Sequence, residues 1–425
     1  MEDNNFNWKS SVWFHVMIDR FCNPDGFSKE LRKEYKKHLA STEDYPAEFA
    51  GGKISGITIN LDYIAELGAD VLYLSPFFKN DDAGTNYHGY HAVDFREVDP
   101  RFGTIQDLEK LIEKAHEKGL KVVMDFVPNH CSTKHPFFKD AKEKKDKRDW
   151  FYFKEDQEKY PDINFKDKKY LTYLGVDALA KINLDNSSAR DYMIETAKFW
   201  LDKGIDGLRL DHVIGPSDTF WKKFNNEIKK YETEHDRDIF LVGEACVDKS
   251  FADNKNTILV GDRNFRKQLI EKYEKDPIEA QQDLQLHYEE MFDGIIDFAF
   301  LKLLRGYLQD ESDEEKFERK LESHFEKYDN SYLPLLLVEN HDTNQIAAGH
   351  ENWEYVHKKA VQIMFEQDFP VMVYYASLLG KKQEIPDIRS VAYGDSHSRP
   401  VCPDELDQKN DRYSLYQKLI SGKKS

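Results

Sequence analysis

Apolar and polar positions follow a repeating order along the chain, which predicts alternating helices and buried strands. Three segments share this order: an amphipathic helical stretch, a glycine, and a short run that is almost entirely apolar. Glycine suits the left-handed backbone that ends many helices, and a near-continuous apolar run is typical of a strand covered on both faces. The three apolar runs lie at 69–75, 120–125 and 205–211.

The helices of this pattern can be placed by their ends. The helix predicted over 104–118 opens with Thr104 and Asp107, the spacing of a capping box. The stretch 52–68 is predicted as one helix that stops at a glycine, and 404–420 as the last helix of the chain.

Five further apolar runs bring the number of predicted strands to eight. Eight strands separated by helical stretches fit a closed (β/α)8 barrel, or TIM barrel, better than an open sheet, so the expected fold class is α/β. The predicted strands lie at 11–18, 69–75, 120–125, 205–211, 238–243, 294–298, 333–338 and 369–374.

One segment interrupts this order after the third strand. About sixty residues separate that strand from the next helix, and a structureless loop of that length is improbable. We therefore predict a small inserted domain, domain B, over residues 131–182. The barrel itself would consist of residues 1–130 and 183–425.

Composition narrows the possible partners and location. The 425 residues carry a net charge of -18, which argues against a nucleic-acid or anionic-membrane partner. No apolar run approaches the length of a membrane span, and the polar N-terminus lacks an export segment. The four cysteines have no CxxC spacing and are predicted to be free thiols in a reducing compartment, so we expect a cytoplasmic protein. The sequence does not indicate an oligomeric state.

Four acidic residues lie at or just beyond the ends of predicted strands: Asp125, Asp211, Glu244 and Asp342. Active-site residues of a (β/α)8 barrel occupy these strand ends. Four carboxylates at one barrel mouth repel one another, which costs stability unless they act together. A close pair of carboxylates is what retaining cleavage of a glycosidic bond requires, one as nucleophile and one as proton donor.

Arg209 and Asp211 are two residues apart on a predicted strand, so their side chains share one face. Taken alone, this spacing fits a structural ion pair. With the other carboxylates, it fits a positioned nucleophile, because a neighbouring cation lowers the pKa of a carboxyl group and keeps it ionised.

Four short segments, in this order along the chain, resemble those of the α-amylase family of glycoside hydrolases. They are DFVPNH at 125–130, GLRLD at 207–211, VGEA at 242–245 and VENHD at 338–342. The segment around His88 and Tyr90 resembles the family's loop that approaches the third strand. The form of 181–183 is most similar to the neopullulanase or maltodextrin-acting branch.

The resemblance implies a role for each candidate residue. Asp211 would be the nucleophile, Glu244 the general acid and base, and Asp342 the stabiliser of the transition state. The substrate would be an α-glucan oligosaccharide such as a maltodextrin, cleaved with retention through a covalent glycosyl-enzyme. Substrate binding would fall to Tyr90, Asp125, Asn129, His130, Arg209 and His341.

Three alternatives stay open at this stage. A 4-α-glucanotransferase would use the same residues with a sugar hydroxyl as acceptor in place of water. A catalytically silent member of the family would usually lack one of the three carboxylates, and all three are present here. The aromatic residues Trp150, Phe151 and Phe153 fit either the core of domain B or a platform for sugar rings.

The sequence also departs from the family's pattern. His212, Gly215 and Ala180 stand where related enzymes carry other residues, which leaves the preferred linkage open. Lys53 follows two glycines where the neopullulanase branch has an aspartate of a calcium site. We therefore expect no metal or other cofactor, with the Lys53 ammonium either paired with Asp25 in place of calcium or facing solvent. The family's C-terminal β-sandwich is also expected to be absent.

Overall fold

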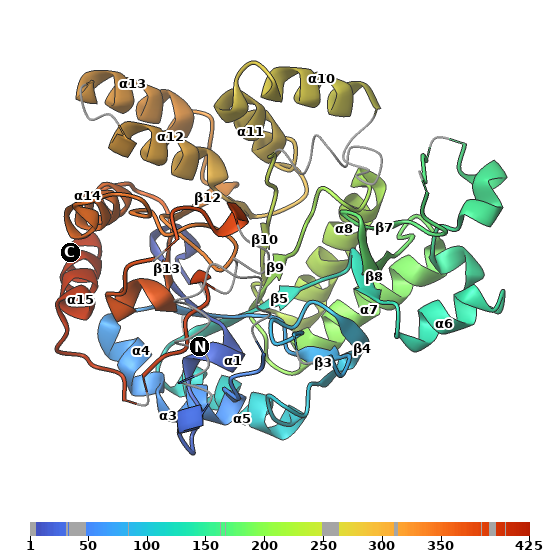
Figure 1. Ribbon diagram of the computed structural model, residues 1–425, viewed down its shortest axis with the longest axis horizontal. Coiled ribbons are helices and arrows are strands. Elements are labelled where there is room, and N and C mark those ends of the chain that lie inside the picture. The colour runs from blue at the N-terminus through green and yellow to red at the C-terminus, as the bar shows by residue number, and fades with distance from the viewer. Residues whose placement is uncertain are drawn as a thin grey trace.

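Eight parallel strands close into a barrel in the computed structural model (Figure 1). The structure describes residues 6–30, 33, 48–83, 85–161, 163–165, 167–248, 263–309, 313–383, 385–390, 397–403 and 405–425. The closed order is β1-β13-β12-β11-β10-β9-β5-β2, which confirms the predicted (β/α)8 fold. The strands are β1 (Val12–Val16), β2 (Val71–Leu74), β5 (Lys121–Phe126), β9 (Gly207–Leu210), β10 (Phe240–Gly243), β11 (Gly294–Ile296), β12 (Leu333–Leu337) and β13 (Val371–Tyr374).

The register of the strands determines where the acidic residues lie along the barrel axis. Asp125 on β5 lies opposite Arg209 on β9, and Leu210 lies opposite Gly243 on β10. Asp211 and Glu244 follow these last two residues directly, so both leave the sheet at the same level of its carboxyl-terminal edge.

Helices follow the strands around the outside of the barrel, and α10 to α13 lie together along one side of it (Figure 1). The α-helices are α1 (Ile18–Phe21), α3 (Ile54–Ile59), α4 (Leu61–Leu67), α5 (Ile105–Glu117), α6 (Pro136–Lys142), α7 (Ser187–Asp202), α8 (Asp218–His235), α10 (Arg263–Tyr273), α11 (Pro277–Leu286), α12 (Phe298–Gln309), α13 (Glu314–Phe325), α14 (Trp353–Phe365) and α15 (Asp411–Lys423).

Two helices differ from the sequence prediction, and in both cases an asparagine gives the reason. The stretch predicted as one helix divides into α3 and α4 at Asn60, whose Nδ2 donates to the carbonyl of Gly56 at 2.8 Å. The last helix begins later than predicted, because the side chain of Asn410 accepts a hydrogen bond from the Tyr413 amide and caps the helix there. The capping box of Thr104 and Asp107 is confirmed at the start of α5.

The segment after the third barrel strand forms a small sheet of its own and projects from the barrel (Figure 1). Its antiparallel strands are β6 (His130–Ser132), β8 (Val176–Lys181) and β7 (Thr172–Tyr173), in that spatial order. A small apolar cluster lies in the same segment, made of Tyr152, Ile163, Phe165 and Leu171. The division of the chain into a barrel and a domain B at 131–182 stays a prediction.

A separate two-stranded sheet, β3 (Phe78–Asn80) with β4 (Ala92–Val98), leads to the site described below. Within the ranges described above, no helix is both long enough and apolar enough to cross a membrane.

Candidate active site

A cavity of about 690 Å³ opens at the carboxyl-terminal end of the barrel and gathers the residues singled out from the sequence. Five of the nine line its wall: Tyr90, His130, Asp211, Glu244 and Asp342. The other four are buried beneath that wall: Asp125, Asn129, Arg209 and His341.

Arg209 stands at the centre of this arrangement. Its Nη1 donates to both carboxylate oxygens of Asp125, at 2.9 and 3.0 Å, and to Asp211 Oδ1 at 2.7 Å. Its Nη2 lies 2.8 Å from Glu244 Oε1. One buried guanidinium therefore holds three carboxylates together and offsets much of their mutual repulsion.

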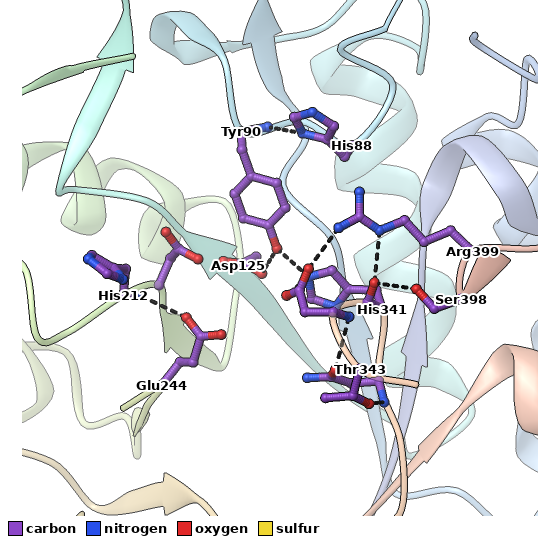
Figure 2. A network of polar contacts seen from close by, with 12 residues as sticks. His88, Tyr90, Asp125, His212, Glu244, His341, Thr343, Ser398 and Arg399 are labelled. Carbon is purple, nitrogen blue, oxygen red and sulfur yellow. Dashed lines mark hydrogen bonds and ion pairs between the residues drawn. The ribbon is translucent and has the colours of Figure 1, made fainter. Parts of the chain in front are cut away.

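A network of aromatic side chains fixes Asp125 and His341 (Figure 2). Tyr90 Oη donates to Asp125 Oδ2 at 2.9 Å and lies 2.8 Å from His341 Nε2. Tyr73 Oη donates to the same oxygen of Asp125 at 2.7 Å. The rings of Tyr90 and His341 are nearly parallel, with an angle of 11° between their planes, so the two side chains also contact each other through their ring faces. Tyr73 was missed in the sequence, where it stands in the middle of an apolar strand.

Asp342 belongs to a second charged cluster across the cavity. Its two carboxylate oxygens lie 2.7 Å from Arg399 Nη2 and 2.7 Å from His341 Nε2. Burial alone would raise the pKa of Asp342, but His341 and Arg399 outweigh it and hold this pKa well below its usual range. Arg399 also donates to the carbonyl of His341 at 2.9 Å (Figure 2). No strand pattern precedes Arg399, so the sequence did not point to it.

The surroundings of Asp211 and Glu244 raise the pKa of both carboxyl groups, so the pair retains a proton more readily than two exposed carboxyl groups would. Burial is the largest effect on both, and it raises the pKa of each carboxyl group although the Arg209 cation opposes the rise. The raised pKa of Glu244 agrees with the sequence prediction. The expectation that the pKa of Asp211 would be low was wrong: Arg209 lowers this pKa as expected, but desolvation outweighs the effect of the cation. The backbone N–H of His212 donates to Glu244 Oε2 at 2.9 Å and fixes this side chain.

Asn129 lies behind the cavity wall. Its Oδ1 accepts a hydrogen bond from the buried ammonium of Lys181, and its Nδ2 lies 3.2 Å from His130 Nδ1. Lys181 Nζ also donates to the carbonyl of Gly215 at 2.8 Å. Burial lowers the pKa of Lys181 to about 7. Asn129 and Lys181 thus join β8 to the loops that follow β5 and β9.

The aromatic residues of the inserted segment divide into two groups. Trp150, Phe151 and Phe153 are buried and pack in the main apolar core, and none of them lines the cavity. Tyr173 does line it, with its ring centre 4.5 Å from that of His130 and 4.8 Å from that of His212. The two-residue strand that carries Tyr173 has too short a pattern to be found in the sequence.

The region around Lys53 shows the contact expected from the sequence. Lys53 Nζ lies 3.8 Å from Asp25 Oδ2. The Asp25 side chain is largely exposed, and that of Lys53 is partly exposed. Among the residues that the structure describes, no group of three or more His, Cys, Asp or Glu side chains is arranged to hold a metal ion.

The chain matches the family model described as alpha amylase, catalytic domain, over residues 16–397. It is 30% identical to alpha-amylase 2 of Dictyoglomus thermophilum, with 98% of this chain and 63% of the relative covered. It is 25% identical to neopullulanase 2 of Thermoactinomyces vulgaris, with 97% and 62% covered. The chain thus spans less than two thirds of the length of these relatives.

A solved structure of an alpha-amylase also resembles this chain in its fold. The alpha-amylase of Geobacillus thermoleovorans in complex with acarbose superposes with a TM-score of 0.70 at 25% identity, over 99% of this chain and 79% of that one. The family match covers all four carboxylates at the mouth of the barrel. The chain belongs to the alpha-amylase family.

Proposed function

We propose that this protein is a retaining glycosidase that cleaves α-glucosidic bonds in maltodextrin-like oligosaccharides. The observation that carries the proposal is the contact of one buried guanidinium, that of Arg209, with both Asp211 and Glu244 at the wall of a 690 Å³ cavity. The names of the relatives, alpha-amylase and neopullulanase, support an α-glucan as substrate.

In the first step, the Asp211 carboxylate attacks the anomeric carbon of the sugar. The new carbon–oxygen bond forms as the glycosidic bond breaks, and Glu244 gives its proton to the leaving oxygen. The leaving sugar departs with a free hydroxyl, and the rest of the substrate stays on Asp211 as an ester.

In the second step, the Glu244 carboxylate takes a proton from water. The resulting hydroxide-like oxygen attacks the anomeric carbon, the ester bond breaks, and Asp211 leaves as a carboxylate. Both residues return to their starting forms, and the product keeps the configuration of the substrate.

The proton must reside on Glu244 at the start, and the contacts of Arg209 support that assignment. Asp211 Oδ1 accepts an aligned hydrogen bond from Nη1 at 2.7 Å, which stabilises its ionised form. Nη2 approaches Glu244 at 2.8 Å but makes no aligned hydrogen bond, so the ionised form of Glu244 gains less from this contact.

Asp342, Tyr90 and His130 would bind the sugar ring as positive charge develops on it. Because His341 and Arg399 keep Asp342 ionised, its carboxylate can stabilise that charge. Four candidates remain. Asp125, Arg209 and His341 hold these groups from below, and Asn129 contacts Lys181 and His130.

Replacement of the nucleophile tests the proposal. Asp211→Asn is nearly isosteric but cannot form the ester, so release of reducing sugar from maltoheptaose should fall by about 10⁴-fold or more. Asp329→Asn, which changes a carboxylate at an exposed turn, is the matched control and should keep wild-type activity. Wild-type activity in Asp211→Asn would contradict the assignment.

Transfer to a sugar acceptor is the alternative outcome of the second step. A time course of products from maltotriose separates the two: glucose and maltose indicate hydrolysis, whereas oligomers longer than the substrate indicate transfer. Pullulan, trehalose and sucrose, tested alongside, would define the preferred linkage.

We also propose that the reaction needs no resident metal and that the protein is cytoplasmic. The first rests on the Lys53–Asp25 contact, and the second on the four cysteines, none of which forms a disulfide. Dialysis against EDTA is expected to leave the rate on maltoheptaose unchanged, and a loss restored by calcium would contradict this. Cell fractionation tests the location.

A further inference from the structure

The hairpin between β7 and β8 turns through a leucine in a conformation that leucine seldom adopts. Tyr173 and Val176 pair across it, and the two residues between them, Leu174 and Gly175, have φ angles of +43° and +87°. Positive φ at both positions is the pattern of a type I′ turn, for which Asn-Gly is the common sequence. Leucine at the first position carries a steric cost that asparagine or glycine would largely avoid.

The strained residue faces the active-site cavity. Leu174 is part of the cavity wall, together with Val176 on the same hairpin and Ile214 from the loop after β9. Val176 is 42% exposed, an unusual position for an apolar side chain of this size. Strained backbone retained beside a functional cavity is often part of the function.

The neighbours of the hairpin show which side of the cavity it borders. The ring of Tyr173 lies 4.8 Å from that of His212, and the His212 amide holds Glu244. In Figure 2, His212 and Glu244 lie together, apart from the group formed by Tyr90, His341 and Arg399. A general acid lies beside the oxygen that leaves. Because the ring of Tyr173 also lies 4.5 Å from that of His130, the hairpin borders both the scissile bond and its leaving-group side.

We propose that Leu174 is a specificity-determining residue that packs against the sugar on the leaving-group side. This proposal rests on the proposed function and adds the kind of leaving group the site selects. Sugar rings present C–H groups on their faces, and Leu174, Val176 and Ile214 offer an apolar surface without hydrogen-bonding groups. The site therefore favours a leaving group that is itself a sugar ring over one that lacks a ring.

Two substrates that both place glucose units on the other side of the bond, but differ in their leaving groups, test this proposal. The leaving group of maltoheptaose is a sugar, whereas the leaving group of α-maltosyl fluoride is fluoride, which has no ring to contact Leu174. Leu174→Asn, which suits the turn, should lower kcat/KM for maltoheptaose by about tenfold. The same variant should leave kcat/KM for α-maltosyl fluoride within about twofold of wild type.

Controls separate this contact from an effect on the fold. Leu174→Gly removes the same side chain and should behave as Leu174→Asn does, and Leu174→Met keeps an apolar side chain and should behave as wild type. Lys144 is also a non-glycine residue of the inserted segment with positive φ, at +59°, and it lies outside the cavity wall. Lys144→Asn should therefore leave kcat/KM unchanged for both substrates. Thermal unfolding of each variant reports whether it is folded.

Two results would overturn the proposal. An equal loss on both substrates in a folded variant would mean that Leu174 only supports the site. Wild-type kcat/KM on both substrates would mean that Leu174 makes no contact with the leaving sugar. If the wild-type protein turned over neither substrate, the proposed function would fail instead, so the two failures are distinguishable.

Discussion

At the scale of single residues, the site depends on one cation that contacts several anions. Arg209 is 1% exposed and makes close contacts with Asp125, Asp211 and Glu244. A guanidinium can do this because its nitrogens lie in one plane and point in fixed, different directions. A lysine ammonium is a single point of charge, so it can replace the charge of Arg209 but not the geometry.

Arg209→Lys is therefore expected to lower kcat on maltoheptaose by about 100-fold, with a smaller change in KM, because it disturbs the reacting carboxylates more than the sugar-binding wall. Steady-state kinetics measure the split. Arg319→Lys, in an exposed ion pair on α13, is the control and should behave as wild type. Equal kcat values for Arg209→Lys and wild type would refute the role assigned to the guanidinium.

Lys181 gives a prediction for stability against pH. Its pKa is about 7 in the folded protein because of burial, whereas an unfolded lysine titrates near its model value of 10.5. Between these values the unfolded chain binds more protons, so the contribution of Lys181 to the free energy of unfolding rises with pH across this window. Below pH 7 the lysine is charged in both states and the cost of burying that charge is fully present.

Lys181→Met should remove this rise, because methionine does not titrate. Urea unfolding at a series of pH values from about 6 to about 10 measures the difference between wild type and variant. Lys316→Met, on the exposed face of α13, should keep the wild-type slope. Parallel curves for wild type and Lys181→Met would contradict the lowered pKa.

At the scale of elements, the sequence predicted what local patterns determine. All eight barrel strands are apolar runs whose burial shows in the sequence itself, and the α5 helix start is set by residues three apart. The break at Asn60 was not predicted, because it depends on a side chain that captures a carbonyl of the preceding turn.

The active site shows the same division between features that local sequence patterns predict and features that depend on distant contacts. Motifs at strand ends named Asp211, Glu244 and Asp342, but no local pattern separates residues that face the cavity from those beneath it. Asn129 was predicted to bind substrate, yet its partners are Lys181 and His130, which pairing across distant segments brings together. Arg399 was not predicted because its contact with Asp342 also joins distant segments, 57 residues apart along the chain.

The capping box of α5 allows a test confined to one element. Thr104 accepts a hydrogen bond from the Asp107 amide, and the Asp107 carboxylate accepts one from the Thr104 amide. Thr104→Ala should lower the free energy of unfolding by about 1 kcal/mol, measured by urea denaturation, with kcat unchanged. Thr104→Ser keeps the hydroxyl and should keep the stability. A fall in kcat for Thr104→Ala would mean that α5 has a closer connection to the site than its position indicates.

At the scale of the whole molecule, a net charge of -18 surrounds a cavity whose proposed substrate is neutral. Long-range fields steer charged ligands, and salt screens them, but a neutral oligosaccharide gains nothing from either. The charges that act on it, those of Asp211, Glu244 and Asp342, are each paired closely with a buried arginine, which leaves little charge for salt to screen. We therefore expect kcat/KM for maltoheptaose to change by less than about twofold between about 50 mM and about 500 mM sodium chloride. A steep dependence on salt would mean that the charges at the cavity are open to solvent and are screened by salt, which would contradict this account.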